Sequence, residues 1–392
     1  MSIKVETKDE MTLVFVSGSI TSANAGKFEE AIADKPGDTA GMIIDASELE
    51  FISSAGLRVI LGAKKRCGTK PFKVIGVNND VKSVFDVTGF SEIMDIEGSV
   101  RKISVEGCQL IGAGACGECY RLDDETIVKL YYPHIENEEI ETEKAFAKKA
   151  FVMGIPTAIS YDIVECDGRI GVMYELIHSK TLGELIREDY SHLDKYIDMY
   201  VDVCKKVGSI RTDDKDIPDF KAGGRAYIDK LNLTDDREKE YLHKFLDLVP
   251  DGDHCIHGDL NINNIMVENG ECVLIDMGEL GVGTPMFDIS RIIFSMVYAN
   301  TAPGTFNSFY KMTSEQVTEI YQKFMLKYYG EPLEEAEKKQ PELRWLYPLA
   351  WFRCCTAMLK TSGWGQDKAD MAKDLLDNHL IPFVDQETKQ SE

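Results

Sequence analysis

The sequence predicts two domains: an α/β domain with a mainly parallel sheet comes first, and a larger α+β domain with a β-rich lobe and a helical lobe follows. Two observations predict this order. Strand-like and helix-like segments alternate through the first hundred residues, which is the pattern of a parallel sheet covered by helices. Beyond a polar stretch at 97–104, short β-type segments come first, and helical periods dominate after about residue 174.

The first domain, which we place at residues 1–100, begins with a hairpin signal. Polar and apolar side chains alternate over 3–8 and 11–18, on either side of a short turn. Buried strands and amphipathic helices then take turns along the chain. The expected elements are strands at 41–47 and 72–78, with helices at 21–35, 53–67 and 80–90. The polar stretch at 97–104 is expected to be a linker.

The second domain, which we place at residues 101–392, contains the two lobes. Strands joined by Gly-rich and Asp-rich turns are expected over 105–132, and a charged helix is expected from Asn137 to Met153. A short strand pair at 265–276 interrupts the later helices. The expected boundaries are about 103–174 for the β-rich N-lobe and about 175–392 for the helical C-lobe.

The chain is strongly acidic, with a formal charge of −23. Residues 1–100 carry −4, so the remaining −19 belongs to the second domain. Such a chain repels polyphosphate and anionic lipid, and we therefore expect neither nucleic acid nor a membrane as a partner. The acidity suits either a cationic small substrate or a solvated surface that aids solubility.

The N-terminal segment MSIKVETKDEMT is polar and lacks the apolar core of a secretory signal. No segment approaches the roughly 20 apolar residues that span a bilayer. With these features, the ten cysteines are expected to be reduced thiols of a cytoplasmic protein. Cys116 and Cys119 form one C-x-x-C pair without a second pair at zinc spacing, so they are interpreted as small apolar residues.

Three glycines in the N-lobe, Gly112, Gly114 and Gly117, form a G-x-G-x-x-G motif. Dinucleotide-binding folds use the same motif before a helix, whereas here a turn and a β-type segment follow. The pattern is therefore strand, loop, strand. Because glycine lets backbone approach phosphates closely, this loop is predicted to be a flexible lid over a nucleotide.

Lys129 lies in the apolar strand after the lid, so its stem is expected to be buried and its ammonium group needs an acceptor. A phosphate of ATP is the natural acceptor. We also expect a carboxylate partner on the following helix and choose Glu143. The other acidic candidates on that helix are Glu136, Glu138, Glu139 and Glu141.

The most specific motif is HGDLNINN, which begins at His257 and fits H-x-D-x-x-x-x-N. Asp259 is predicted to position an attacking hydroxyl and accept its proton, and Asn264 to offer a carbonyl oxygen to Mg²⁺. Asp276, at the end of an apolar strand, is predicted to bind the metal as well. Singly, these residues could be a turn residue, a cap and a strand end. His257 and Asp288 are expected to have structural roles.

From about residue 103 onward, these motifs resemble the aminoglycoside phosphotransferase and choline kinase branch of the protein-kinase-like superfamily. Gly258 and Asn261 occupy positions where protein-serine kinases usually carry Arg and Lys, which favours a small-molecule hydroxyl acceptor. The resemblance implies a bilobal kinase-like fold, ATP and Mg²⁺ as cofactors, and adenine contacts from a hinge at Glu175 and Leu176.

The resemblance also implies that helices at about 184–250 and 310–385 build the acceptor pocket. Carboxylates in the first of these regions could meet a cation, or they could be plain surface charge. The candidates are Asp213, Asp214, Asp216 and Asp219.

Residues 1–100 resemble a STAS domain, the fold of anti-sigma-factor antagonists, through IIDASELEFISSAGLRVILGAKK and VFDVTGF. In that family a serine at the start of the central helix is phosphorylated, and Ser54 corresponds to it. Ser53 stands where the family carries Asp, and an N-cap role for Ser53 or Ser54 is the structural alternative. The resemblance implies an anti-sigma factor or switch protein as a partner.

Together these features predict an ATP-dependent phosphotransferase acting on a hydroxyl of a small, cationic acceptor, with a regulatory STAS domain. One alternative is a regulatory binding protein whose kinase-like part senses nucleotide. Another is a kinase that phosphorylates Ser54 of its own or a neighbouring STAS domain.

Overall fold

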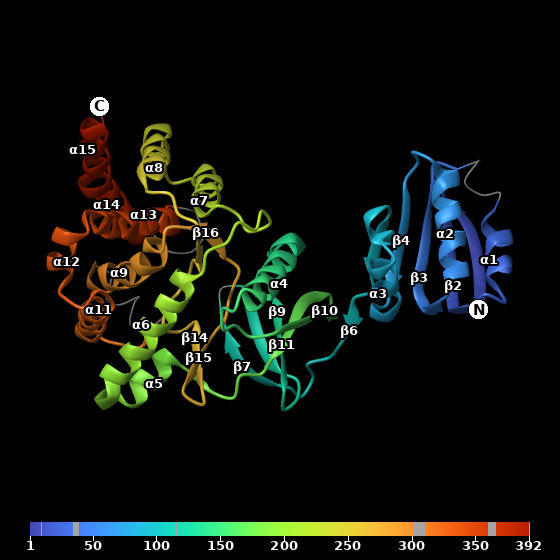
Figure 1. Cartoon of the computed structure of the whole chain (residues 1–392), viewed down its shortest axis with the longest axis horizontal. Coiled ribbons are helices and arrows are strands. Elements are labelled where there is room, and N and C mark those ends of the chain that lie inside the picture. The colour runs from blue at the N-terminus through green and yellow to red at the C-terminus, as the bar shows by residue number, and fades with distance from the viewer. Residues whose placement is uncertain (9, 34–38, 115, 302–309, 360–365, 392) are drawn as a thin grey trace. The chain divides into compact units, whose positions relative to one another are not determined.

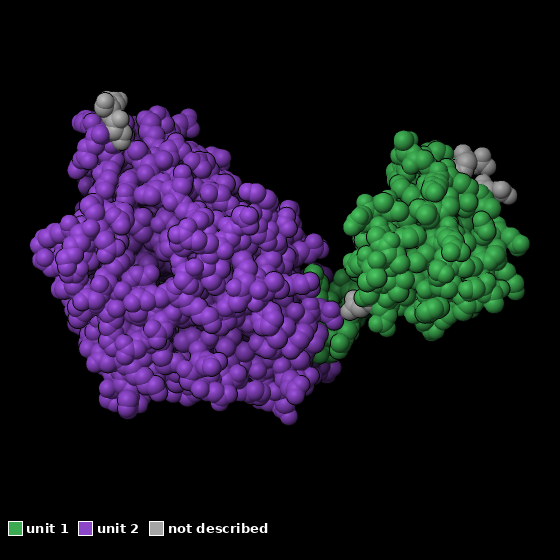
Figure 2. Space-filling model, in the orientation of Figure 1, with its two compact units in different colours: residues 1–104, 163–168 green, residues 105–162, 169–392 purple. Residues whose placement is uncertain are grey.

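The computed structural model describes residues 1–8, 10–33, 39–114, 116–301, 310–359 and 366–391. The chain divides into two compact units, coloured separately in Figure 2. The first unit contains residues 1–104 and 163–168, and the second contains 105–162 and 169–392. Each unit has its own cluster of buried apolar side chains.

The first unit is built on a five-stranded sheet with the order β1-β2-β3-β4-β5. β1 and β2 form the expected antiparallel hairpin, and the remaining neighbours are parallel. The strands are β1 (Ser2–Lys8), β2 (Met11–Ile20), β3 (Gly41–Ile52), β4 (Phe72–Val77) and β5 (Asp95–Gly98). The helices are α1 (Ala25–Ile32), α2 (Ser54–Cys67), α3 (Asn79–Val87) and a 3₁₀ turn at Phe90–Glu92. Figure 1 shows the helices lying beside this sheet.

The predicted linker at 97–104 was wrong in part. β5 extends to Gly98 at the edge of the first sheet, and β6 (Arg101–Lys102) pairs in parallel with β10 (Ser160–Cys166). The segment is polar, but its extended backbone satisfies its hydrogen bonds by pairing with other strands. Side-chain polarity therefore did not reveal the strand.

The β-rich lobe is built around a six-stranded sheet with the order β6-β10-β11-β9-β8-β7. Besides β6 and β10, its strands are β7 (Gln109–Ala113), β8 (Gly117–Arg121), β9 (Thr126–Tyr131) and β11 (Arg169–Glu175). α4 (Asn137–Val152) follows β9 and lies against this sheet (Figure 1). The predicted order of a β-rich lobe followed by a helical lobe is confirmed.

The helical lobe carries two small sheets, ordered β12-β14-β15 and β13-β16. Their strands are β12 (Lys180–Thr181), β13 (His254–Ile256), β14 (Ile265–Glu268), β15 (Glu271–Leu274) and β16 (Gly281–Gly283). The loop between β13 and β14 carries the HGDLNINN motif. β14 and β15 form the hairpin expected at 265–276.

Helices make up the rest of this lobe. They are α5 (Leu182–Glu188), α6 (Leu193–Ser209), α7 (Phe220–Asp229), α8 (Asp236–Leu248), α9 (Met286–Thr301), α11 (Ser314–Tyr329), α12 (Leu333–Lys339), α13 (Leu346–Met358), α14 (Gln366–Leu375) and α15 (Ile381–Ser391). Short turns lie at Tyr190–His192, Pro341–Trp345 and Leu376–Leu380. Within the described residues, none of the helices is both long and apolar enough to cross a bilayer.

Candidate active site

The loop between β13 and β14 is fixed by a buried carboxylate. Asp288 of α9 accepts hydrogen bonds from the backbone N–H groups of His257 and Gly258, both at 2.9 Å. Burial raises the pKa of the Asp288 carboxyl, and these two N–H groups oppose that shift. Asp288 therefore has the scaffold role that was expected of it.

His257 ties the same loop to the end of β15. Its Nε2 lies 3.2 Å from the carbonyl oxygen of Ile275, and its Nδ1 accepts from the backbone N–H of Asp259 at 3.3 Å. This pattern of partners assigns the proton to Nε2. His257 is fully buried, as a structural residue would be.

Asp259 is held from two sides. Asn264 donates its side-chain N–H to Oδ2 at 3.0 Å, and Arg291 of α9 donates Nε–H to Oδ1 at 2.5 Å. The Asp259 side chain keeps 33% of its surface exposed. Burial raises its pKa, but the charge and hydrogen bond of Arg291 outweigh burial and bring the pKa well below its usual range. An ionised carboxylate with an open face can accept a hydrogen bond from a hydroxyl group.

Lys129 of β9 joins the two lobes of this unit. Its ammonium group lies 2.7 Å from Glu143 Oε1 of α4 and 3.2 Å from Asp276 Oδ1 beyond β15. Burial lowers the pKa of Lys129, but the charges of Asp276 and Glu143 outweigh it and raise the pKa above its ordinary value. Tyr174 of β11 also donates to Glu143, at 3.3 Å. Lys129 therefore stays charged in a site where only 15% of its side chain is exposed.

Asn264 and Asp276 are brought together by the β14–β15 hairpin. The backbone N–H of Ile275 donates to the carbonyl oxygen of Asn264 at 3.0 Å, one residue before Asp276. Asp276 has φ +65, a left-handed conformation that is uncommon for a residue with a side chain and recurs at functional sites. Its side chain is 48% exposed.

The donor chemistry of this pair fits a magnesium ion. Among the described residues, no group of three or more His, Cys, Asp or Glu side chains is arranged to hold a metal. Mg²⁺, however, is usually held by one or two protein oxygens together with phosphate oxygens and water. The exposed carboxylate of Asp276 and the amide oxygen of Asn264 can supply that number.

The three lid glycines have different local requirements. A Cβ on Gly117 would meet the carbonyl oxygen of Leu130 at 2.3 Å, so the sheet itself requires glycine there. A Cβ on Gly114 would meet nothing within 4 Å, and one on Gly112 only Cys119 Cβ at 4.0 Å. Gly112 and Gly114 therefore leave open space that a bound phosphate could use.

The expected hinge residues end β11. The backbone N–H of Glu175 donates to the carbonyl of Ile159 at 3.0 Å, and that of Leu176 donates to the carbonyl of Glu125 at 2.7 Å. Both donors are thus used within the protein. Adenine contacts from these two residues would have to come from their carbonyl oxygens.

A family model described as the phosphotransferase enzyme family matches residues 108–310, which is more than half of the chain. The chain belongs to this phosphotransferase family. The STAS domain model matches residues 2–103. The chain thus joins a STAS domain to a phosphotransferase of the kinase-like fold, as the motifs predicted.

Several known proteins are similar to one part or the other. A Bordetella bronchiseptica protein named as the anti-sigma factor antagonist BtrV is 29% identical over 102 residues, which cover 25% of this chain and 88% of that protein. The ADP-bound aminoglycoside phosphotransferase APH(2'')-Ib is 13% identical, with a TM-score of 0.46, over 70% of this chain and 94% of the other. Amicoumacin kinase hAmiN, in complex with AMP-PNP, Ca²⁺ and Ami, is 15% identical, with a TM-score of 0.47. The match covers 77% of this chain and 96% of the other.

Three charged residues around the loop between β13 and β14 were not predicted from the sequence. Arg291 of α9 contacts Asp259, and Arg353 of α13 donates to the carbonyl oxygen of Gly258. Glu279 lies against Gly258 and is exposed to solvent. The available signal was an arginine within an otherwise apolar helix, as in FDISRIIFS and WFRCC.

Three of the four acidic residues considered for the acceptor pocket have partners elsewhere. Asp214 and Asp216 pair with Lys149 of α4, at 2.6 and 3.1 Å. Asp219 caps α7 by accepting from the backbone N–H of Ala222. Asp213 is exposed. These residues therefore do not form a group of carboxylates that is open to a cation.

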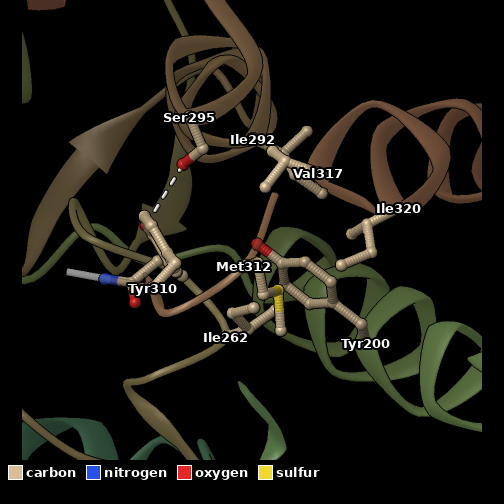
Figure 3. A pocket seen from close by; sticks show the side chains of 9 residues that line it. Tyr200, Ile262, Ile292, Ser295, Tyr310, Met312, Val317 and Ile320 are labelled. Carbon is tan, nitrogen blue, oxygen red and sulfur yellow. Dashed lines mark hydrogen bonds between the residues drawn. The ribbon is translucent and has the colours of Figure 1, made fainter. Parts of the chain in front are cut away.

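A small apolar pocket adjoins the loop between β13 and β14 (Figure 3). It lies between the loop, α6, α9 and α11, and its cavity volume is about 20 Å³. Its only hydrogen bond in Figure 3 joins the hydroxyl groups of Ser295 and Tyr310, at 3.2 Å. The lining residues are Tyr200, Asn261, Ile262, Ile292, Ser295, Tyr310, Met312, Val317 and Ile320.

In the STAS domain, Ser53 and Ser54 have different environments. Ser53 is the N-cap of α2, and its hydroxyl oxygen accepts from the backbone N–H of Gly56 at 3.4 Å. Ser54 is the first residue of the helix and is exposed. The N-cap alternative therefore applies to Ser53, while the hydroxyl of Ser54 is accessible from solvent.

Proposed function

We propose that residues 101–392 transfer the γ-phosphoryl group of ATP to a hydroxyl group of a small, cationic acceptor, and that residues 1–100 regulate this activity. The observation that carries the proposal is the chain of contacts through the site. Lys129 lies between Glu143 and Asp276, and Asn264 connects the Asp276 side of the site to Asp259. The site thus brings together the groups that phosphotransfer needs. They are a cation to bind phosphate, two oxygen donors for a metal and an acceptor for a hydroxyl proton.

The proposed roles follow from the chemistry of each group. Lys129, oriented by Glu143, would bind a phosphate oxygen of ATP, and the lid at Gly112, Gly114 and Gly117 would cover the phosphates. Asp276 and Asn264 would hold Mg²⁺, which when bound neutralises the developing charge on the phosphates. Asp259 would accept a hydrogen bond from the attacking hydroxyl and orient it toward the γ-phosphorus.

The reaction is balanced without a further reactant. The acceptor oxygen forms a bond to the γ-phosphorus, and the bond between that phosphorus and the bridging oxygen of ADP breaks. The hydroxyl proton leaves by way of Asp259 to solvent. The products are ADP, the phosphate ester and one proton.

The test uses the full chain with γ-labelled ATP, Mg²⁺ and a panel of amino alcohols and aminoglycosides. We expect label on one class of acceptor, and a loss of about 10²–10⁴-fold in Asp259→Ala and Asp259→Asn. Asp213→Ala, which removes an exposed aspartate, should keep the wild-type rate. A wild-type protein that neither binds ATP nor labels any acceptor would refute the proposed function.

A second candidate is phosphorylation of the STAS domain, and the environment of Ser54 favours it. The residue is exposed and is not needed as the cap. A phosphate there would lie at a helix N-terminus, where free N–H groups and the helix dipole stabilise negative charge. In the same assay, label on the protein that disappears in Ser54→Ala but persists in Ser53→Ala would support it. Label that persists in both variants would exclude Ser54.

A further inference from the structure

Arg291 is a charged residue in an apolar helix whose role is not explained by the proposed reaction alone. It lies in α9, where only 11% of its side chain is exposed. Its Nε–H donates to Asp259 Oδ1, and its Nη1 donates to the hydroxyl of Ser295 at 3.2 Å. The guanidinium carbon also lies 4.5 Å from the ring centroid of Phe294.

The far side of this guanidinium group is held by the hydroxyl groups that line the small pocket. Ser295 Oγ also lies 3.2 Å from the hydroxyl of Tyr310, which is the hydrogen bond drawn in Figure 3. Arg291 is therefore fixed between Asp259 on one side and Ser295 on the other. A planar guanidinium group with several donors suits this geometry better than an ammonium group does.

The contacts of Asp259 show what Arg291 contributes to the site. One carboxylate oxygen is bound by Arg291, and the other by Asn264. Because these donors come from two separate elements, the carboxylate plane cannot rotate without breaking one of the two bonds. The remaining open surface of Asp259 is thus presented in one orientation. A misplacement of about 1 Å at such a group can lower a rate about 10²-fold.

The competing explanation is that Arg291 merely stabilises the fold. The burial of its ion pair with Asp259 argues against that explanation. Buried ion pairs are weak contributors to stability, because desolvation offsets much of their attraction. Arg291 lies in the position where it constrains the single carboxylate that would face the acceptor. We propose that Arg291 is the positioning residue for Asp259. This inference rests on the proposed phosphotransfer.

The experiment compares Arg291→Met and Arg291→Lys with the wild-type full chain. Arg344→Gln is the matched control, because Arg344 pairs with the buried Glu387 at 2.8 Å away from the catalytic loop. Turnover of Mg-ATP is measured with the best acceptor, or with water as acceptor if none is found. The Kd for ATP and the melting temperature are measured for each variant. Hydrogen exchange of the peptide containing residues 257–264 is followed as well.

We expect Arg291→Met to lower kcat about 10²-fold while the KM and Kd for ATP change less than about twofold. Arg291→Lys should recover part of the rate, and added guanidinium ion should partly restore Arg291→Met. Exchange of the loop peptide should increase in Arg291→Met and stay unchanged in Arg344→Gln.

Two results would overturn the inference. One is a folded Arg291→Met protein with wild-type kcat, and the other is unchanged exchange of the loop peptide in that variant. The exchange measurement requires no turnover, so it tests the role of Arg291 even if the wild-type protein transfers no phosphate. Failure of the proposed function would instead appear in the wild-type assay.

Discussion

At the scale of single residues, the loop between β13 and β14 shows how a backbone requirement and a proposed chemical role meet in adjacent positions. Gly258 has φ +87, and a Cβ there would lie 2.4 Å from Glu279 Cβ and 2.6 Å from its carbonyl oxygen. Asp259, the next residue, is the proposed acceptor for the hydroxyl group and is held by Asn264 and Arg291. Glycine therefore permits the tight turn that precedes Asp259 and passes close to Glu279.

This geometry predicts that Gly258→Ala lowers activity more than the positive φ of residue 258 alone would. A left-handed non-glycine residue costs about 1–3 kcal/mol. Gly270→Ala is the matched control, because Gly270 has φ +86 and a Cβ there would meet nothing within 4 Å. We expect both variants to lose thermal stability, but only Gly258→Ala to lose phosphotransfer by more than tenfold. Equal activity in the two variants would contradict the steric argument.

At the scale of elements, α4 supplies the carboxylate that orients Lys129. The helix starts at Asn137 and buries Glu143 together with Ile140 and Phe146 on the face toward the sheet. β9 places Lys129 opposite that face. The position of α4 relative to β9 therefore decides whether this ion pair forms.

Glu143→Gln is expected to keep the fold and weaken ATP use. Charge-assisted hydrogen bonds contribute about 1.5–3 kcal/mol. Because about 1.36 kcal/mol corresponds to a tenfold change in rate, losing this hydrogen bond should lower kcat/KM for ATP about 10- to 150-fold. Glu141→Gln, which changes an exposed glutamate two residues earlier on the same helix, should leave kcat/KM unchanged. Steady-state kinetics at varied ATP concentration measure both, and equal effects would refute a specific role for Glu143.

Local patterns predicted the elements that carry the site, because those patterns are contiguous in sequence. The HGDLNINN loop, the hairpin after it and the helix at Asn137 all follow from short-range spacing. The contacts of Arg291 and Arg353 could not be predicted in this way, since they reach the loop from 32 and 95 residues away. Likewise, β6 is recognisable only from its pairing with β10, which lies far along the chain.

The basic partners of the acidic residues could not be predicted either, because they also lie far away in the sequence. Lys149 is 65 residues from Asp214, and only the fold places them in contact. A charge that looks available in the sequence can thus be neutralised by a distant lysine. Composition predicts whether the surface carries net negative or positive charge. It does not predict which carboxylates lack a basic partner in the fold.

At the scale of the whole molecule, each compact unit has a separate apolar core. Phe28 of α1 is fully buried in the first core, and Phe245 of α8 is fully buried in the second. Phe245 packs against the rings of Trp345, Phe352 and Phe383. All three of these rings lie beyond residue 310, so the helices that follow the family match belong to the core of the phosphotransferase.

These separate cores predict two unfolding transitions that can be shifted one at a time. Replacing a buried phenylalanine with alanine costs about 3–5 kcal/mol, because the transfer energy is lost and a cavity remains. Phe28→Ala should lower only the transition of the STAS domain, and Phe245→Ala only that of the phosphotransferase. Calorimetry combined with hydrogen exchange of peptides from each unit assigns the transitions, and each variant is the control for the other. If either substitution lowered both transitions by similar amounts, the two cores would have to unfold as one cooperative unit, and the proposed regulation by the STAS domain would then act through stability.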